Sequence, residues 1–295
     1  MPIGLANAPV SWGIMEVEGW TAPPIPCTTF LDELKAAGYD ATELGPYGYF
    51  PTDAAVLRAE LEGRSLALAS AFTPLRLKQP GLDLAPAREV AKLLQACGAR
   101  HLVLADAMWP EREAVSGRVE ESSVRLTDRD WQTVAANLRR ASELAAAFGL
   151  RPVFHHHAGT YIETPEECAR LLASTGVALC LDTGHYVYGG GDPVQAVQSF
   201  GRRIEYLHFK DVDPARLDHA RRLKLDFVGA VRAGIFCPLG SGSVRFPDLL
   251  RALDRIDYDG WAVVEQDVDA SDPNAPPPRI AARASREYLR SELGI

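Results

Sequence analysis

Residues 151–185 read RPVFHHHAGTYIETPEECARLLASTGVALCLDTGH and contain one strand–helix–strand unit. Two short runs, RPVFHHH (151–157) and VALCLD (177–182), have the length and apolar character of buried strands. Between them, Thr164-Pro165 is typical of a helix N-cap followed by proline, and Gly176 is typical of a helix end. The unit therefore predicts two parallel strands that are joined by a helix.

The same alternation repeats along the chain. Eight strand-like runs, each followed by a helical pattern, are IGLAN (3–7), DATEL (40–44), LALASAF (66–72), HLVLAD (101–106), RPVFHHH (151–157), VALCLD (177–182), IEYLHFK (204–210) and WAVVEQ (261–266). This order predicts an α/β fold, a single closed (β/α)8 TIM barrel over residues 1–295. An open, doubly wound sheet is the alternative, but no G-x-G-x-x-G motif follows the first run. Two inserts, about 107–126 and 211–235, follow the fourth and seventh strands and either cover a site or form surface loops.

The composition is that of an ordinary soluble globular protein. The chain has 295 residues, of which 47% are hydrophobic and 24% charged. Its net charge of −8 argues against a protein that binds nucleic acid. Five widely spaced cysteines without a C-x-x-C pair, no signal-peptide pattern and no membrane-length apolar run predict a cytoplasmic protein without a membrane partner.

Polar residues follow the predicted strands where a barrel places its active site, at the carboxyl ends. They are Asn7, Glu43, Asp106, His155, His157, Asp182, His208, Lys210 and Glu265. A carboxylate, an imidazole and a second carboxylate at the ends of the sixth, seventh and eighth strands predict a divalent metal site that is open to substrate.

Three consecutive histidines end the fifth predicted strand. Because side chains alternate along a strand, His155 and His157 are expected on one face and His156 on the other. Two histidines on one face suit a metal site or a pair of acid and base.

Other polar segments allow two interpretations each. The glycine-rich PLGSGSVRF (238–246) offers backbone N–H groups to an anion or a substrate hydroxyl, or it is a plain turn before a helix. Asn7, Trp12 and Glu43 either line a sugar pocket or serve packing and capping.

Several motifs together resemble the xylose-isomerase-like family of sugar isomerases and epimerases. They are LDTGH (181–185), LHFKD (207–211), PLGSGSVRF (238–246) and the strand-end Glu265. Within that superfamily, NAPVSWG (7–13), ELGPYGYFPTD (43–53) and FHHHAGTYIET (154–164) resemble the inosose dehydratases, which dehydrate 2-keto-myo-inositol. The resemblance implies a hydro-lyase of inositol catabolism.

The resemblance also implies a ligand set. The superfamily binds its metal through Glu, Asp, His and Glu, and Asp182, His208 and Glu265 match the last three. His155 stands where the first Glu is expected, and His157 matches a histidine that faces the substrate. A neutral imidazole in place of a carboxylate favours Mn²⁺ or Co²⁺ over Mg²⁺, and the resemblance implies the same two metals.

The expected reaction is loss of water from a cyclic keto-polyol through an enediolate. His157 and His185 are the candidate acid and base, Lys210 would stabilise the oxyanion, and Glu265 would act as ligand and base. A metal-dependent sugar isomerase or epimerase with the same site is the main alternative. An abasic-site endonuclease and a catalytically inactive sugar-binding barrel are further alternatives. A homo-oligomer paired through outer helices is compatible with the fold, although the sequence shows no interface.

Overall fold

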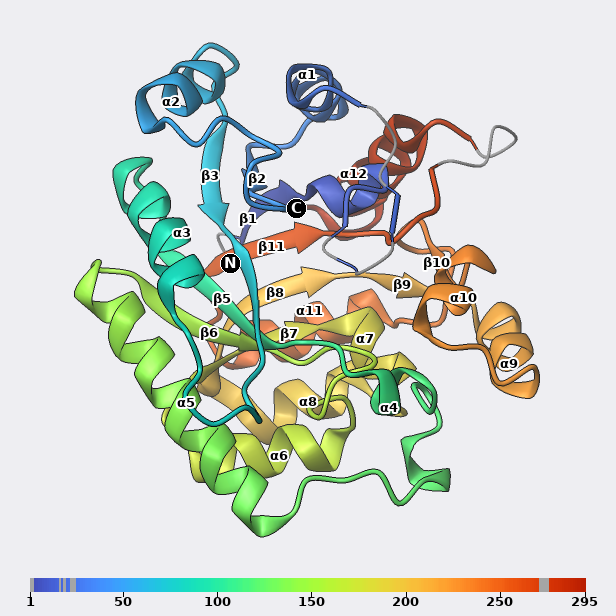
Figure 1. The fold of residues 1–295 in the computed structure, drawn as a ribbon. Coiled ribbons are helices and arrows are strands. Elements are labelled where there is room, and N and C mark those ends of the chain that lie inside the picture. The colour runs from blue at the N-terminus through green and yellow to red at the C-terminus, as the bar shows by residue number, and fades with distance from the viewer. Residues whose placement is uncertain (1–2, 16, 18–19, 22–24, 271–275) are drawn as a thin grey trace.

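The computed structural model describes residues 3–15, 17, 20–21, 25–270 and 276–295. Strands and helices alternate as predicted (Figure 1). The strands are β1 (Ile3–Asn7), β2 (Ala41–Glu43), β3 (Ala67–Ser70), β4 (Phe72–Leu75), β5 (His101–Asp106), β6 (Arg151–His155), β7 (Ala178–Asp182), β8 (Ile204–Phe209), β9 (Asp211–Val212), β10 (Phe236–Cys237) and β11 (Gly260–Val264). The helices are α1 (Cys27–Ala37), α2 (Ala54–Glu62), α3 (Ala85–Ala96), α4 (Pro110–Glu113), α5 (Asp128–Ala147), α6 (Pro165–Ser174), α7 (Thr183–Tyr188), α8 (Pro193–Phe200), α9 (Pro214–Arg222), α10 (Phe227–Arg232), α11 (Phe246–Arg255) and α12 (Pro278–Leu293).

One long sheet closes into the barrel because its two edge strands, β3 and β4, follow each other directly in the chain. The sheet order is β3-β2-β1-β11-β8-β7-β6-β5-β4, and all the paired strands in it are parallel. β3 and β4 are separated only by Ala71, and β3 pairs with β2 while β4 pairs with β5. They are therefore two halves of one strand, and the eight strands of the predicted TIM barrel are confirmed.

Alternate side chains on each strand face the barrel interior and the surrounding helices. In β5, which is buried throughout, Leu102 and Leu104 belong to the large core under the helices. Val103, between them, packs inside the barrel with Val153 and Val263. Because both faces of the sheet are covered, these strands are almost continuously apolar.

Side-chain caps fix where α6 and α8 begin. Thr164 accepts the amide of Glu167, whose carboxylate in turn accepts the amide of Thr164, so the pair forms a capping box. Asp192 accepts the amide of Val194 at the start of α8. The Thr-Pro signal in the sequence therefore marked a correct helix start, and Asp192-Pro193 begins α8 in the same way.

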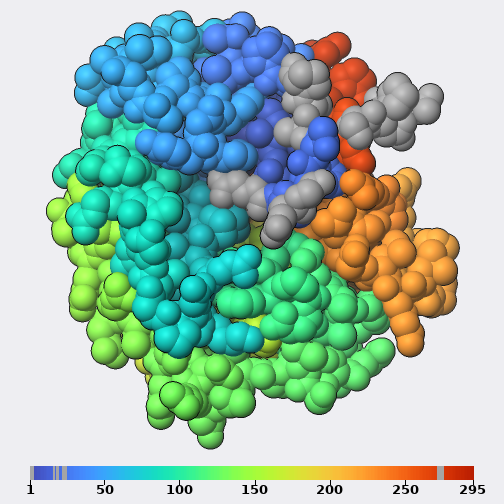
Figure 2. All heavy atoms as spheres, in the orientation of Figure 1, coloured from blue at the N-terminus to red at the C-terminus, as the bar shows by residue number. Residues whose placement is uncertain are grey.

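The two inserts form small helical layers beside the barrel. Residues 107–126 contain α4 and a 3-10 turn at Val119–Glu121, and residues 211–235 contain β9, α9 and α10. Arg118 of the first insert donates to the carbonyl oxygen of Leu225 in the second at 3.0 Å. Figure 2 shows these green and orange segments in contact on one face of the molecule. Within the described part of the chain, no helix is both long and apolar enough to cross a membrane.

Candidate metal centre and active site

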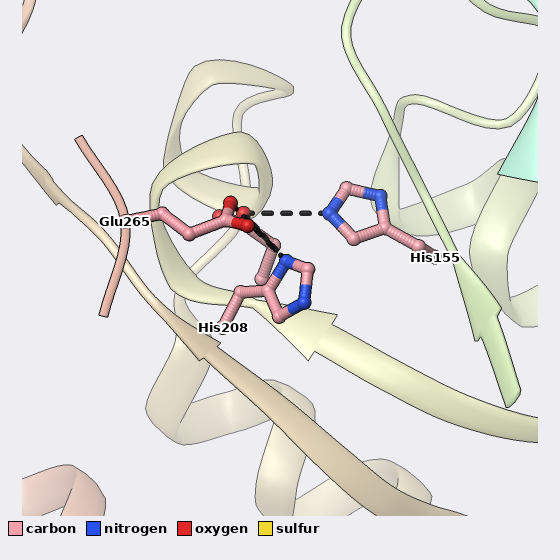
Figure 3. A group of neighbouring side chains, drawn as sticks. His155, His208 and Glu265 are labelled. Carbon is pink, nitrogen blue, oxygen red and sulfur yellow. Dashed lines mark ion pairs between the residues drawn. The ribbon is translucent and has the colours of Figure 1, made fainter. Parts of the chain in front are cut away.

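Four side chains from neighbouring strand ends converge inside the barrel. His155 ends β6, Asp182 ends β7, His208 lies in β8 and Glu265 follows β11 directly. One ligand atom from each lies within 4.8 Å of the others, and all four residues are buried. Figure 3 shows His155, His208 and Glu265 pointing toward one another from different strands. The structure thus brings together all four residues that the sequence offered as metal ligands.

The atoms at the centre of this group suit a cation. Asp182 Oδ2 lies 3.4 Å from His155 Nε2 and 3.7 Å from His208 Nδ1, which in turn lies 3.2 Å from Glu265 Oε2. Asp182 Oδ2 and His208 Nδ1 are buried, and neither makes a hydrogen bond to another described residue. Buried polar atoms without a hydrogen bond are costly, whereas two imidazoles and two carboxylates are ordinary ligands of divalent transition metals. The residues present therefore fit a divalent metal ion.

Both carboxyl groups of this cluster favour the ionised form that a metal ligand needs. Burial opposes ionisation of Glu265, but the neighbouring His208 and Lys210 lower the pKa of its carboxyl to about 2. Burial likewise opposes ionisation of Asp182, and the ammonium group of Lys210 nevertheless holds its pKa well below the usual range. The second oxygen of Asp182 accepts the amide of His185 at 2.8 Å and caps α7, which fixes the carboxylate in place.

The three consecutive histidines divide as the alternation predicted, although β6 ends at the first of them. His155 and His157 both line a cavity at the carboxyl ends of the strands. His156 turns away, and its ring packs edge-on against Tyr186 with centroids 5.3 Å apart. Its Nε2 accepts the amide of Asp182 at 3.3 Å. His156 therefore supports the ligand strand from behind.

His157 forms a close pair with His185 in the same cavity. Their ring centroids are 4.0 Å apart. His157 Nδ1 lies 2.7 Å from the carbonyl oxygen of Ala158, which can only accept, so the ring proton is on Nδ1 and a lone pair remains on Nε2. Burial lowers the pKa of His157 to about 3 and that of His185 well below its usual range. Both rings are therefore neutral.

Lys210 is a buried ammonium group beside the metal cluster. Its Nζ lies 3.1 Å from Glu265 Oε2, 2.8 Å from Asp267 Oδ1 and 3.1 Å from His185 Nε2. Burial opposes its charge, but the carboxylates of Asp182, Asp267 and Glu265 raise its pKa above the usual range. Lys210 is therefore a permanent positive charge in the cavity.

Asp267 is a site residue that the sequence reasoning missed. Only 3% of its surface is exposed, and it lines the cavity together with Lys210. Burial raises the pKa of its carboxyl to about 6. Asp267 follows Glu265 by two positions, as His157 follows His155 and Lys210 follows His208. The same two-residue spacing was the signal that could have identified it.

Of the three predicted substrate-binding residues, the structure brings only Glu43 to the cavity. Trp12 is fully buried, its indole N–H donates to Glu33 at 2.7 Å, and its ring packs against Phe30. Asn7 is also fully buried, and its side-chain oxygen accepts the amide of Ala8. Trp12 therefore serves packing and Asn7 serves capping, the second of the two interpretations that the sequence allowed.

The glycine-rich segment 238–246 is a structural turn. The amides of Gly240, Gly242 and Val244 all donate to the carboxylate of Asp211, at 2.9, 2.9 and 3.0 Å. These N–H groups already hold an anion that belongs to the chain, so they are not free to hold a substrate anion. The plain-turn interpretation of this segment is the correct one.

The cavity has a volume of about 200 Å³. Besides the polar residues, its walls include Ile14, Met15, Phe72, Arg76, Asp106, Met108 and Phe227. Met108 comes from the first insert and Phe227 from the second, so both inserts contribute to the walls. The insert regions thus help to shape the site rather than lying apart from it.

The protein is a closed parallel barrel whose strand ends carry a His-Asp-His-Glu cluster and a buried lysine. These features define a class of barrel proteins with a candidate metal site that faces a cavity for small polar molecules. The family model described as "Xylose isomerase-like TIM barrel" matches residues 31–292, and the chain belongs to this family.

Curated relatives match nearly the whole chain. The rhizopine catabolism protein MocC of Rhizobium meliloti is 36% identical over 98% of this chain and 88% of its own length. An inosose dehydratase of Geobacillus kaustophilus is 34% identical over 98% of this chain and 94% of its own length. Among solved structures, a probable 3-DHS dehydratase, AsbF of Bacillus anthracis, superposes with a TM-score of 0.70 at 16% identity, covering 98% of this chain and 99% of that one. This last likeness concerns the fold.

Proposed function

We propose that the protein is a metal-dependent hydro-lyase that dehydrates an inosose, 2-keto-myo-inositol, in inositol catabolism. The observation that carries the proposal is the convergence of four ligand-type side chains and a neutral histidine pair on one small polar cavity. The near full-length relative named inosose dehydratase supports the choice of substrate.

His155, Asp182, His208 and Glu265 would hold the metal ion. When bound there, a divalent ion acts as a Lewis acid that polarises the ketone and makes the neighbouring C–H bond acidic. The two imidazole ligands favour Mn²⁺ or Co²⁺ over Mg²⁺.

The remaining cavity residues would move the protons. His157 takes the proton from the carbon next to the ketone, because its Nε2 carries the lone pair and its Nδ1 is tied to Ala158. The proton passes from His157 to His185, whose ring centroid lies 4.0 Å away, and His185 delivers it to the departing hydroxyl group, so that water leaves and a carbon–carbon double bond forms. Lys210, which lies 3.1 Å from His185 Nε2, keeps its proton and stabilises the negative charge that develops on the ketone oxygen.

Turnover of scyllo-inosose tests the proposal directly. Purified protein stripped of metal is mixed with the substrate before and after addition of Mn²⁺, and the ultraviolet absorbance of the conjugated dione product is followed. We expect absorbance to grow only with metal. His157→Gln should abolish most of this growth, whereas His219→Gln, on the exposed surface of α9, should leave it unchanged.

A flat trace with metal demonstrably bound would exclude the dehydratase. Ketose substrates would then be tested for isomerisation or epimerisation, which use the same initial proton removal but return the proton to carbon.

We also infer that the protein works in the cytoplasm. Its five cysteines are all free thiols, which suits a reducing compartment. Fractionation of cells that express the tagged full chain would test this, and recovery from an oxidising compartment would contradict it.

A further inference from the structure

We propose that Glu43 is a positioning residue for the metal centre: its carboxylate fixes the tautomer and the orientation of His208. The inference deepens the proposed function, because it rests on metal binding by the cluster that contains His208. It also gives Glu43 a different role from direct contact with substrate.

The two ring nitrogens of His208 face different partners. Nε2 lies 3.0 Å from Glu43 Oε1, on the side away from the cluster. Nδ1 faces Glu265 Oε2 at 3.2 Å and Asp182 Oδ2 at 3.7 Å. An ionised carboxylate can only accept hydrogen bonds, so His208 Nε2 carries the ring proton in this pair. In the neutral ring the lone pair is then on Nδ1, where a metal ion would need it.

Glu43 is itself held firmly in the barrel. The pairing of β2 with β3 shifts register between Thr42 and Glu43, which places Glu43 opposite Ser70. Ser70 Oγ donates to Glu43 Oε1 at 2.7 Å, and the hydroxyl of Tyr206 donates to Ser70 Oγ at 3.0 Å. Irregularities of this kind commonly redirect a side chain next to a site.

The hydrogen-bonding capacity of Glu43 Oε1 is therefore used by neighbouring protein side chains. This oxygen accepts from both Ser70 and His208, and only 2% of the Glu43 surface is exposed. A buried carboxylate near two ligand carboxylates is unfavourable unless it has a strong donor. The hydrogen bond to His208 supplies that donor and explains why a third acidic group is tolerated beside Asp182 and Glu265.

Metal affinity is the decisive measurement, because it does not depend on turnover. Co²⁺ would be titrated into metal-free protein in competition with a chelator, and its visible absorption spectrum recorded for the bound form. Glu43→Ala should weaken Co²⁺ binding by about 10- to 100-fold and change the spectrum, since His208 loses the partner that orients it. Glu43→Gln keeps an oxygen that can accept from Nε2, and it should recover most of the affinity. Ser70→Ala should have a smaller effect than Glu43→Ala.

A destabilised control separates orientation from general loss of structure. Leu68→Ala removes core packing from β3, on the side that faces the helices, and leaves the Glu43–His208 contact intact. Well below its melting temperature, this variant should bind Co²⁺ as tightly as the unaltered protein.

Each other outcome has a defined meaning. If Glu43→Ala binds Co²⁺ with unchanged affinity while KM for inosose rises, Glu43 contacts substrate and the inference is wrong. Equal weakening by Glu43→Ala and Leu68→Ala would also refute it. If the unaltered protein binds neither Co²⁺ nor Mn²⁺, the proposed metal-dependent function itself fails, and the failure is visible before any variant is made.

Discussion

A buried ion pair between Arg112 and Glu167 should hold the first insert against the barrel. Arg112 lies in α4, is fully buried, and donates through both terminal nitrogens to the two carboxylate oxygens of Glu167, each at 2.9 Å. It also donates to the carbonyl oxygen of Val124, at the far end of the same insert, at 3.1 Å. Glu167 in turn accepts the amides of Glu163 and Thr164 at the start of α6. The pair therefore ties residues 107–126 to the loop that follows His157.

The cost of breaking the pair follows from its burial. Removing one partner leaves the other as a buried, unpaired charge, which costs about 3–5 kcal/mol. Arg112→Met should lie near the lower value, because Glu167 keeps its two amide donors. Glu167→Leu should lie near the upper value, because the guanidinium loses its counter-charge. With an unfolding entropy of about 2.1 cal/mol/K per residue, a chain of this length should melt roughly 5–8 °C lower.

Urea denaturation followed by circular dichroism, with calorimetry for the melting temperature, would measure each variant and the double variant. A buried ion pair replaced on both sides by apolar residues is often close to neutral. The double variant Arg112→Met/Glu167→Leu should therefore cost about 1–2 kcal/mol, chiefly for the lost cap of α6, and far less than the sum of the single changes. Additive costs, or single changes that each cost less than about 1 kcal/mol, would refute this account of how the insert is held.

Three further predictions concern the site and its surroundings. His155→Ala should weaken Co²⁺ binding in a chelator competition, and retained affinity with lost turnover would instead place His155 among residues that contact substrate. Lys210→Met should lower kcat by about 10²–10³-fold without weakening Co²⁺ binding, because it removes a positive charge beside the ligands; an effect on KM alone would argue against its charge-stabilising role. Burial lowers the pKa of His101 to about 4, so below about pH 6.5 only the unfolded chain takes up this proton, and stability is lost as the pH falls toward 4. His101→Gln should reduce this loss by up to about 3 kcal/mol in urea denaturation at pH 7 and pH 4.5, and an unchanged loss would contradict the assignment.

Most strands could be predicted from the sequence because barrel strands are short, apolar and bounded by helix signals. β1 and β5 have the predicted limits, residues 3–7 and 101–106. The largest departure is the third strand, predicted at 66–72, which continues to Leu75 as β4. Pro74 lies in that continuation, and a residue without an N–H group normally argues against a strand. Here the paired strand tolerates it, and the continuation is what closes the barrel against β5.

The metal-type cluster could be predicted because its members share one simple property, a polar side chain at the end of a strand. His155, Asp182, His208 and Glu265 all have it, and parallel strands of a barrel bring their carboxyl ends together. Asn7 has it too, yet its side chain caps the neighbouring amide of Ala8. The position along a strand predicts which edge a residue reaches but not whether its side chain finds a nearer partner.

The role of Glu43 illustrates what pattern alone cannot supply. Glu43 and His208 are 165 positions apart, and two other strands, β1 and β11, separate their strands in the sheet. Only closure of the barrel brings the two side chains face to face across its interior. In the sequence, Glu43 and Glu265 are both carboxylates at the ends of predicted strands, and nothing in the pattern distinguishes their roles. In the structure, one reaches His208 Nε2 and the other approaches His208 Nδ1, 3.0 and 3.2 Å away. Glu43 would therefore orient the His208 ring, whereas Glu265 would bind the same metal ion as His208. This difference depends on how the His208 ring is rotated, and the spacing of residues in the sequence does not determine that rotation.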